Sequence, residues 1–319
     1  MSDPRAQSAP RRHLLAVTDL SREDVERVLD TASSLAASLE REMKKLPTLR
    51  GRTVVNLFYE SSTRTLASFE LAAKRLSADT MSIRSSGSSV DKGESLKDTA
   101  LTLAAYEPDV IVVRHPSIGA PQLVARHTSA HVVNAGDGKH QHPTQALLDL
   151  YTMREALGRL EGIRVAVVGD VLHSRVARSL VQALALVGAE TVLVGPPTLV
   201  PRGLEGLGCE ISHDVAAIDG ADVVYVLRMQ HERMEEAFVP SLREYTALYG
   251  ITPDRVSSRQ VVMHPGPMNR GIEIDARVAD SEQALVTDQV RAGLIVRMAV
   301  LYDVLTVAAV ESRERAGVA

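Results

Sequence analysis

The chain has 319 residues, of which 45% are hydrophobic and 24% are charged, and its formal net charge is −4. This balance is typical of a globular protein with a substantial core, and the length is sufficient for two domains. The negative charge argues against a nucleic-acid-binding protein, and an aromatic content of 3% without tryptophan leaves few rings for stacking on bases.

The chain ends and the single cysteine, Cys209, give little reason to expect a secreted or membrane protein. One cysteine forms neither an intramolecular disulfide nor a thiolate zinc cluster, so nothing requires an oxidising compartment. Residues 1–12 are polar, lack the apolar segment of a signal peptide, and are expected to be disordered. The apolar segment near the C-terminus is interrupted by Asp288, Arg291 and Arg297, which indicates an amphipathic or buried helix. We therefore expect a cytoplasmic enzyme with no membrane attachment.

Helical and strand patterns alternate along the first half of the chain. Ser21 and Asp24 form a capping-box pattern that predicts a helix start, and apolar residues at helical spacing continue to Ala36. Short runs rich in Val and Ile then predict strands at 53–58, 80–83, 109–113 and 131–135. Helical patterns separate them at 64–76, 94–106 and 119–127. This alternation predicts βαβ units and a parallel sheet.

The same alternation resumes after a helix that begins at Pro143, the favoured first position, and ends near Gly158. Strand patterns occur in RVAVVGD, ETVLVG, CEISH, DVVYVL and QVVMHPGP, with a helix over 174–187. They predict a second parallel sheet. The fold class is therefore α/β, with two domains that each contain a parallel sheet flanked by helices. We predict domains at 1–150 and 151–289, with a C-terminal helix at about 290–319 that returns to the first domain.

The segment FYESSTRT, residues 58–65, crowds hydroxyl groups around Arg64 where a strand passes into a helix. In a parallel sheet, ligands bind beyond the carboxyl ends of the strands. A helix that begins there offers unpaired backbone N–H groups and the positive end of its dipole. The guanidinium of Arg64 matches the geometry of a phosphate group. The segment therefore predicts an anion site; the alternative is an ordinary helix cap with a solvated arginine.

Two further segments carry cations near the predicted first sheet. The segment SSGSSVDKGE, residues 85–94, contains Ser88 and Lys92 between glycines. It is either a mobile surface loop or a lid that brings a hydroxyl and a positive charge to a substrate. In VIVVRHP, Arg114 follows a buried strand, a position that favours a ligand-binding role over that of a surface charge.

The loop GDGKHQHPTQ, residues 136–145, brings His142 and Gln145 to a helix start. His140 and His142 raise the question of a metal site. No carboxylate or cysteine stands at ligand spacing to complete one, so we predict no metal ion.

The predicted second sheet also ends in polar loops. The turn VVGDVLHSRVARS lacks the glycine pattern G-x-G-x-x-G, which argues against a dinucleotide, but it carries Arg175 at a helix start. Arg228 and Gln230 follow the strand in VLRMQHER, and Pro265 and Gly266 follow the strand in VVMHPGP.

Four arginines share this relation to a strand end: Arg64, Arg114, Arg175 and Arg228. We expect their charges to converge on one cleft. Such a set of cations suits a ligand set with several negative charges.

These segments, in this order, resemble the aspartate and ornithine carbamoyltransferase family. FYESSTRT is similar to the family's carbamoyl-phosphate signature, and RHP, HPTQALLDLYT, SRVARS, RMQHERM and MHPGPMNRGIEI follow in the family's order. The resemblance covers residues from about 12 to 310. It implies carbamoyl transfer from carbamoyl phosphate to the α-amine of L-aspartate in pyrimidine biosynthesis, with no metal or organic cofactor.

Within the family, the aspartate branch fits better than the ornithine branch. The ornithine branch usually carries a cysteine in an H-C-L-P loop and an S-M-G motif, whereas this chain has HPGP and LRMQ. The alternatives are a carbamoyltransferase for another amine, such as ornithine, and a non-catalytic anion-binding protein. Two departures from the family pattern are Leu66, where an arginine is common and whose presence we expect to loosen the helix start, and Gly266, where a leucine is common.

The resemblance also implies residue roles. Catalytic roles fall to Arg64, Thr65, Lys92, Arg114 and His142. The residues implied to bind carbamoyl phosphate are Ser62, Thr63, Arg64, Thr65, Ser88, Arg114, His142, Gln145, Pro265 and Gly266. Those implied to bind aspartate are Lys92, Arg175, Arg228 and Gln230. Ser88 and Lys92 would enter from a neighbouring subunit, which makes a homotrimer the smallest active unit. Regulatory chains or partner enzymes of the pathway are not predictable from the sequence.

Overall fold

The computed structural model describes residues 13–84, 93–230 and 238–315, and of residues 307–315 it describes the backbone only. The chain divides into two units, the first comprising Met1–Gly138 and Gly293–Ala319 and the second Lys139–Ala292. The contact-based division therefore runs before the helix that begins at Pro143, whereas the sequence-based boundary at residue 150 runs through it. Each unit contains one parallel sheet, and the predicted α/β fold is confirmed.

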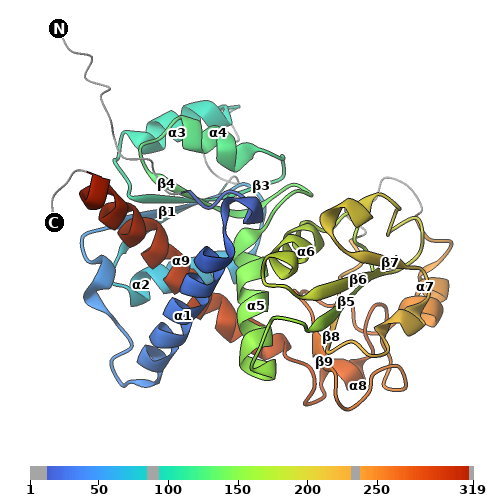
Figure 1. Ribbon diagram of the computed structural model, residues 1–319. Coiled ribbons are helices and arrows are strands. Elements are labelled where there is room, and N and C mark those ends of the chain that lie inside the picture. The colour runs from blue at the N-terminus through green and yellow to red at the C-terminus, as the bar shows by residue number, and fades with distance from the viewer. Residues whose placement is uncertain (1–12, 85–92, 231–237, 316–319) are drawn as a thin grey trace, which may run out of the picture. The chain divides into compact units, whose positions relative to one another are not determined.

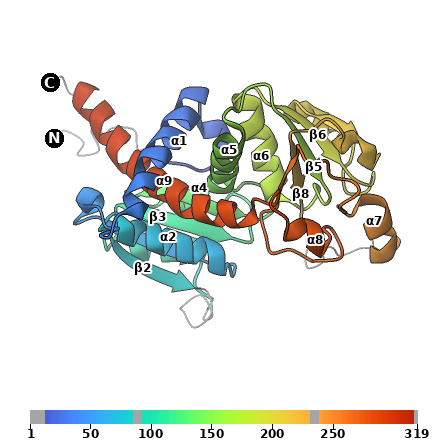
Figure 2. The same cartoon turned by 90° about the horizontal axis from the view of Figure 1, so that it is seen from below.

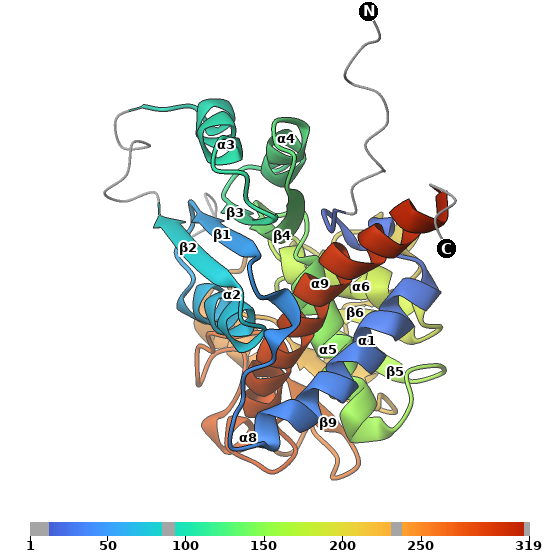
Figure 3. The same cartoon turned by 90° about the vertical axis from the view of Figure 1, so that its left-hand side faces the viewer.

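The first unit holds a four-stranded sheet in the order β2-β1-β3-β4, and all neighbouring strands are parallel. The strands are β1 (Thr53–Phe58), β2 (Asp79–Arg84), β3 (Val110–His115) and β4 (His131–Asp137). From β1 the chain passes to β2 on one side, and β3 lies on the other side (Figure 3). The order of strands therefore reverses between β1 and β3, which is where open α/β sheets bind ligands.

Helices cover both faces of this sheet, as Figures 1 and 3 show. The helices are α1 (Arg22–Ala36), α2 (Thr63–Arg75), α3 (Leu96–Ala104) and α4 (Ala120–Arg126), with short 3-10 helices at Val17–Asp19, Ala37–Glu40 and Pro47–Leu49. On the face toward α3 and α4, Leu57 and Val113 pack against Leu103 and Val124. Burial on both faces explains why β1 and β3 are almost continuously apolar.

The long C-terminal helix α9 (Val286–Arg315) belongs to the first unit from Gly293 onward. It lies between α1 and α2 (Figure 2). Arg297 Nη1 donates to Ser68 Oγ of α2 at 2.6 Å, and Arg27 Nε of α1 donates to Asp303 Oδ1 at 2.8 Å. Two charged residues of this helix, Arg297 and Asp303, therefore attach it to its neighbours, and its predicted return to the first domain is confirmed. Among the described helices, none is long and apolar enough to span a membrane.

The second unit holds a five-stranded parallel sheet in the order β7-β6-β5-β8-β9. Its strands are β5 (Arg164–Val168), β6 (Glu190–Val194), β7 (Glu210–Ser212), β8 (Val223–Val226) and β9 (Val261–Met263). The strand order reverses between β5 and β8, which gives this sheet its own ligand-binding position.

The helices of the second unit are α5 (Pro143–Leu157), α6 (Arg175–Leu186), α7 (Leu242–Tyr249) and α8 (Ala276–Ala279), with 3-10 helices at Leu204–Leu207 and Val215–Ile218. α5 and α6 lie on the same face of the sheet (Figures 1 and 2). The opposite face packs against Ile218 and Val278. The sequence did not predict α7 or α8, because α8 is four residues long and α7 has only two buried residues, Tyr245 and Tyr249.

Local signals at helix ends are confirmed. Ser21 Oγ accepts from the N–H of Asp24 at 3.2 Å while Asp24 Oδ2 accepts from the N–H of Ser21 at 3.0 Å, which completes the predicted capping box. Pro143 is the first residue of α5. Gly158 ends this helix at φ 74°, a left-handed conformation that glycine adopts readily, and its N–H donates to Arg154 O at 2.9 Å.

Candidate substrate-binding residues

The predicted anion site lies where the strand order of the first sheet reverses. Ser62 caps α2, since its Oγ accepts from the N–H of Thr65 at 3.4 Å. Thr63 and Arg64, the first two residues of the helix, are exposed, and Thr65 is buried. Ser62 therefore has the helix-capping role that was predicted as the alternative for this segment. The helix start still presents N–H groups, a hydroxyl and a guanidinium at the carboxyl end of β1.

Leu66 lies in a regular helix start, and its expected loosening effect stays a prediction. The side chain of Leu66 is buried, and its N–H donates to Ser62 O at 3.1 Å, the first regular bond of the helix. A leucine at this position contributes to the apolar face of α2, and the cap does not depend on a side chain there.

Arg114 is buried at the end of β3, the strand beside β1. Its Nη2 donates to Glu60 Oε1 at 2.9 Å, and its Nη1 donates to Ala135 O at 3.2 Å. The N–H of Tyr59 donates to Arg114 O at 2.8 Å, which ties the turn after β1 to the end of β3. The carboxylate of Glu60 therefore holds the guanidinium in one orientation. An incoming anion would compete with this carboxylate for the guanidinium. The sequence did not predict a role for Glu60, although Glu60 lies within FYESSTRT.

In the second unit, His142 and Gln145 are buried at the start of α5. The N–H of His142 donates to Ser179 Oγ at 2.8 Å, and Ser179 Oγ donates to Gln141 Oε1 at 2.9 Å. α6 therefore fixes the backbone that carries His142. Gln145 Nε2 donates to Asp149 Oδ1 one turn further along α5, at 3.1 Å.

The other predicted residues of this unit follow three neighbouring strands, β5, β8 and β9. Arg175 is buried as the first residue of α6, and Arg228 and Gln230 come directly after β8. The N–H of Gln230 donates to Asp170 Oδ2 at 3.3 Å, and His173 Nδ1 lies 2.8 Å from Asp170 Oδ1. Asp170 therefore joins the two loops across the point where the strand order reverses. Asp170 was not predicted from the sequence, although it follows the glycine of VVGD.

Gly169 has a structural role in this turn. Its φ is +121°, and a Cβ built there would lie 2.9 Å from Tyr245 Oη and 3.1 Å from Leu227 O. Only glycine adopts this conformation without strain and leaves room for these neighbours. The turn therefore serves close packing at the end of β5.

The loop after β9 is held by buried polar groups. The N–H of Gly266 donates to His264 Nδ1 at 2.8 Å, so the ring proton lies on Nε2, which is 3.3 Å from Glu273 Oε1. The N–H of His264 donates to Gln289 Oε1 at 2.9 Å. Gly266 has φ 63°, a left-handed value, which gives a backbone reason for glycine where the family often has leucine. Pro265 stands between these two anchored residues.

Ser88 and Lys92 lie outside the residues that the structure describes. Across the described ranges, no group of three or more His, Cys, Asp or Glu side chains could hold a metal ion. The predicted residues that the structure describes thus fall into two sets, one in each unit. Those of the first unit follow β1 or end β3, and in the second unit all except His142 and Gln145, which lie at the start of α5, follow β5, β8 or β9.

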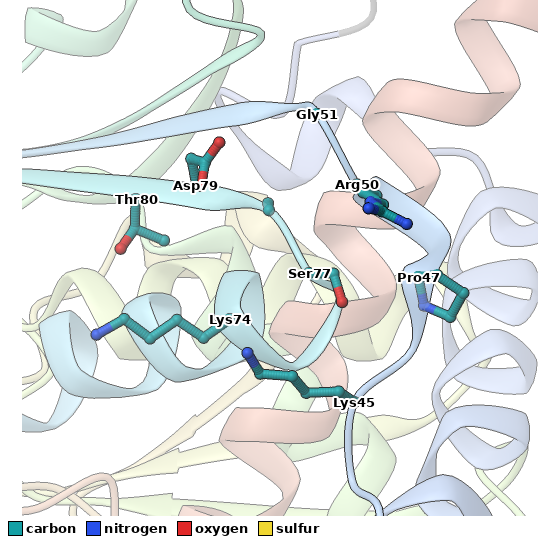
Figure 4. Close-up of a pocket in the computed structure, with 9 residues that line it drawn as sticks. Lys45, Pro47, Arg50, Gly51, Lys74, Ser77, Asp79 and Thr80 are labelled. Carbon is teal, nitrogen blue, oxygen red and sulfur yellow. The ribbon is translucent and has the colours of Figure 1, made fainter.

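A cavity of about 850 Å³ in the first unit contains none of the predicted residues (Figure 4). Its lining includes Lys45 and Arg50 before β1, Lys74 at the end of α2, and Asp79 at the start of β2. It therefore lies toward the amino ends of the strands, at the opposite edge of the sheet from Ser62 and Arg114.

Most of the chain matches the two domains of one protein family. Residues 12–155 match the aspartate/ornithine carbamoyltransferase carbamoyl-phosphate-binding domain, and residues 161–304 match the Asp/Orn-binding domain of the same family. The chain belongs to the aspartate/ornithine carbamoyltransferase family. The resemblance drawn from the sequence motifs is confirmed.

Individual carbamoyltransferases are also similar to this chain in sequence and in structure. The aspartate carbamoyltransferase catalytic subunit of Thermobifida fusca is 57% identical over 298 residues, covering 92% of this chain and 95% of that protein. A crystal structure of aspartate transcarbamoylase from Trypanosoma cruzi with carbamoyl phosphate and aspartate has a TM-score of 0.84 at 31% identity, covering 95% of this chain and 99% of that one. The same enzyme in complex with N-(phosphonacetyl)-L-aspartic acid has a TM-score of 0.84 at 31% identity, with coverages of 95% and 98%.

Proposed function

We propose that this chain transfers the carbamoyl group of carbamoyl phosphate to the α-amine of L-aspartate, giving N-carbamoyl-L-aspartate and phosphate for pyrimidine biosynthesis. The observation that carries the proposal is 57% identity over 92% of the chain to a catalytic subunit with this activity in its name. The position of arginines at the strand-order reversal of each sheet supports it. The loop HPGP without cysteine favours aspartate over ornithine as the acceptor.

The first unit would bind the phosphate. The exposed start of α2 offers N–H groups, Thr63 and Arg64, and Arg114 lies at the end of the neighbouring strand. A dianionic phosphate is stabilised by such donors and by the positive end of the helix. Arg114 would bridge the phosphate and the carbonyl oxygen, and Thr65 would donate to the same oxygen.

The second unit would bind the dicarboxylate and the carbamoyl amide. Arg175, Arg228 and Gln230 follow neighbouring strands and match the two carboxylates of aspartate in charge. Gln145 and the carbonyl oxygens of Pro265 and Gly266 would accept hydrogen bonds from the carbamoyl amide. Carbamoyl phosphate and aspartate, which are both negatively charged, would then bind side by side because each is neutralised by its own set of cations.

The reaction needs positioning and charge stabilisation. The amine nitrogen of aspartate attacks the carbonyl carbon, the C–N bond forms, and the carbonyl oxygen takes up negative charge. Arg114 and His142 donate to this oxyanion. The C–O bond to phosphate then breaks and phosphate leaves with the bonding electron pair. We assign the amine proton to the leaving phosphate; a pH–rate profile that shifts on mutation of a protein side chain would replace this assignment.

A homotrimer with shared active sites, in the cytoplasm, remains part of the proposal. Among the described residues, the edge strand β2 and the neighbouring α2 expose the apolar side chains Met81 (36%) and Leu71 (40%), which suits a subunit contact. A single half-buried cysteine, Cys209, gives no reason for an oxidising compartment. Sizing chromatography combined with activity tests the trimer, since a fully active monomer would contradict it.

A colorimetric assay of carbamoylated product, with aspartate and ornithine offered side by side, tests the activity. We expect product from aspartate at a kcat/KM at least about a hundredfold above that for ornithine, because the arginines repel the ornithine side-chain ammonium. Preference for ornithine would identify the other branch. Phosphate binding without product from either amine would identify an anion-binding protein.

A further inference from the structure

Among the described residues of the second unit, three side chains donate hydrogen bonds to a fully buried carboxylate, Asp149 of α5. Tyr225 Oη donates to its Oδ2 at 2.7 Å. Gln145 Nε2 and Gln289 Nε2 both donate to its Oδ1, at 3.1 Å and 2.7 Å. A buried carboxylate without such donors would be strongly destabilising, so these contacts offset the cost of burying it.

Two of the three donors lead to the groups that the proposed function assigns to the carbamoyl amide. Gln145 is itself one of them. Gln289 Oε1 accepts a hydrogen bond from the N–H of His264 at 2.9 Å. His264 begins the loop that contains Pro265 and Gly266. Asp149 therefore connects α5, α9 and the loop after β9 through two glutamine amides.

The chemistry of a carboxylate decides how these amides point. An ionised carboxylate only accepts hydrogen bonds, whereas a glutamine amide has a donating NH₂ and an accepting oxygen. Both glutamines must therefore turn their NH₂ groups toward Asp149. This leaves Oε1 of Gln145 as the acceptor on the other side of its amide. It also makes Oε1 of Gln289 the acceptor that fixes the His264 loop.

The third donor keeps this arrangement in place. Burial, together with the neighbouring charge of Asp149, raises the pKa of Tyr225 well above its ordinary value, so the hydroxyl stays protonated. Tyr225 thus occupies Oδ2, and both glutamines share Oδ1.

We propose that Asp149 is a positioning residue that makes the site selective for the NH₂ group of the carbamoyl donor. It orients the Gln145 amide and, through Gln289, the carbonyl groups of the 265–266 loop, so that all three present acceptors. A carbamoyl group donates two hydrogen bonds to such acceptors, whereas the acetyl group of acetyl phosphate, which has a methyl group in the same place, donates none. This inference rests on the proposed function.

The test uses the purified full-length chain and compares the KM of carbamoyl phosphate with the inhibition constants of acetyl phosphate and inorganic phosphate. Asn in place of Asp149 offers a donor as well as an acceptor, so the glutamine amides can turn over. We expect Asp149→Asn to raise the KM of carbamoyl phosphate about 10- to 100-fold, with both inhibition constants within about twofold of wild type.

Two further variants make the test specific. Gln289→Met removes both the hydrogen bond to Asp149 and the acceptor for the His264 N–H, and it leaves Gln145 on Asp149. It should also raise the KM of carbamoyl phosphate relative to the inhibition constant of acetyl phosphate, and it provides the answer if Asp149→Asn does not fold. Asp222→Asn is the matched control. Asp222 Oδ2 accepts from the N–H of Arg164 at 2.8 Å, at the opposite edge of the same sheet, and this variant should keep wild-type selectivity.

The outcomes are distinct. Loss of selectivity against acetyl phosphate in Asp149→Asn and Gln289→Met, but not in Asp222→Asn, supports the proposal. Wild-type selectivity in the folded variants, or equal weakening of all three ligands, overturns it. A wild-type chain that forms no carbamoyl aspartate contradicts the proposed function instead.

Discussion

Arg114 Nη2 and Glu60 Oε1 form an ion pair of 2.9 Å between the end of β3 and the turn after β1. Both side chains are largely removed from solvent, so the pair is only weakly screened. The guanidinium that the proposed function assigns to the substrate is therefore already oriented, and partly neutralised, before an anion arrives.

We predict that Glu60→Gln binds inorganic phosphate roughly three- to tenfold more tightly, because a negative charge close to Arg114 is removed. Isothermal titration calorimetry with phosphate measures this. The control is Asp109→Asn, which breaks the 2.7 Å contact between Arg52 and Asp109 beside the amino end of β3 and should leave phosphate affinity unchanged. Weaker phosphate binding in Glu60→Gln would show that the carboxylate does not compete with the ligand.

His142→Ala should lower kcat about 10²- to 10³-fold, the usual effect of removing one oxyanion donor. Steady-state kinetics with both substrates saturating measures the change. His140→Ala, two residues away in the same loop, serves as the control and should stay near the wild-type rate. A fall of less than roughly threefold in His142→Ala would refute the role of this side chain.

Gly169→Ala should destabilise the protein by about 2 kcal/mol or more, because the new Cβ meets Tyr245 Oη at 2.9 Å and Leu227 O at 3.1 Å at a φ of +121°. Urea denaturation monitored by circular dichroism gives the free energy of unfolding. At Gly206 a Cβ would meet nothing within 4 Å, so Gly206→Ala should change this free energy little. Equal effects at both positions would contradict the packing argument.

His115, next to Arg114, should make stability depend on pH. Burial lowers the pKa of its imidazole below the ordinary 6.5, and Nδ1 accepts from the N–H of Ser117 at 2.9 Å, a bond lost on protonation of that nitrogen. The unfolded state then binds the proton more readily, so the His115 contribution to stability is present above about pH 6.5 and is lost as the pH falls through the lowered folded value.

The measurement is the difference in the free energy of unfolding between wild type and His115→Gln, followed from about pH 7.5 to 5.5. We expect the wild type to lose stability relative to the variant as the pH falls. A difference that is independent of pH, or that grows in favour of the wild type at low pH, would contradict this assignment.

The sequence was a good guide to the fold because local signals dominate its elements. Runs of Val and Ile mark strands buried on both faces, and Pro143 and Gly158 mark the ends of α5. The charges in α9 read only as interruptions of an apolar pattern. Asp303 of this helix and its partner Arg27 lie 276 residues apart, and such a pairing is not visible in the spacing of one segment.

Of the candidate site, the sequence predicted the residues that follow strands. It did not predict the groups that orient those residues. Arg114 and Arg228 stand out because charge follows a buried strand directly. The groups that orient them or their neighbours do not stand out: Glu60 lies 54 residues from Arg114, and Asp149 lies 140 residues from Gln289. These contacts arise from the strand order and from helix packing, which a single sequence does not specify.

The proposed function requires cations from both units to act on one pair of substrates. Calorimetric binding of N-(phosphonacetyl)-L-aspartate, which joins a phosphonate to an aspartate, tests it most directly in Arg114→Ala and Arg228→Ala, with inorganic phosphate as the second ligand. We predict that each variant loses affinity for the joined compound by at least about a hundredfold, while only Arg114→Ala loses affinity for phosphate. Wild-type affinity of Arg228→Ala for the joined compound would contradict the account.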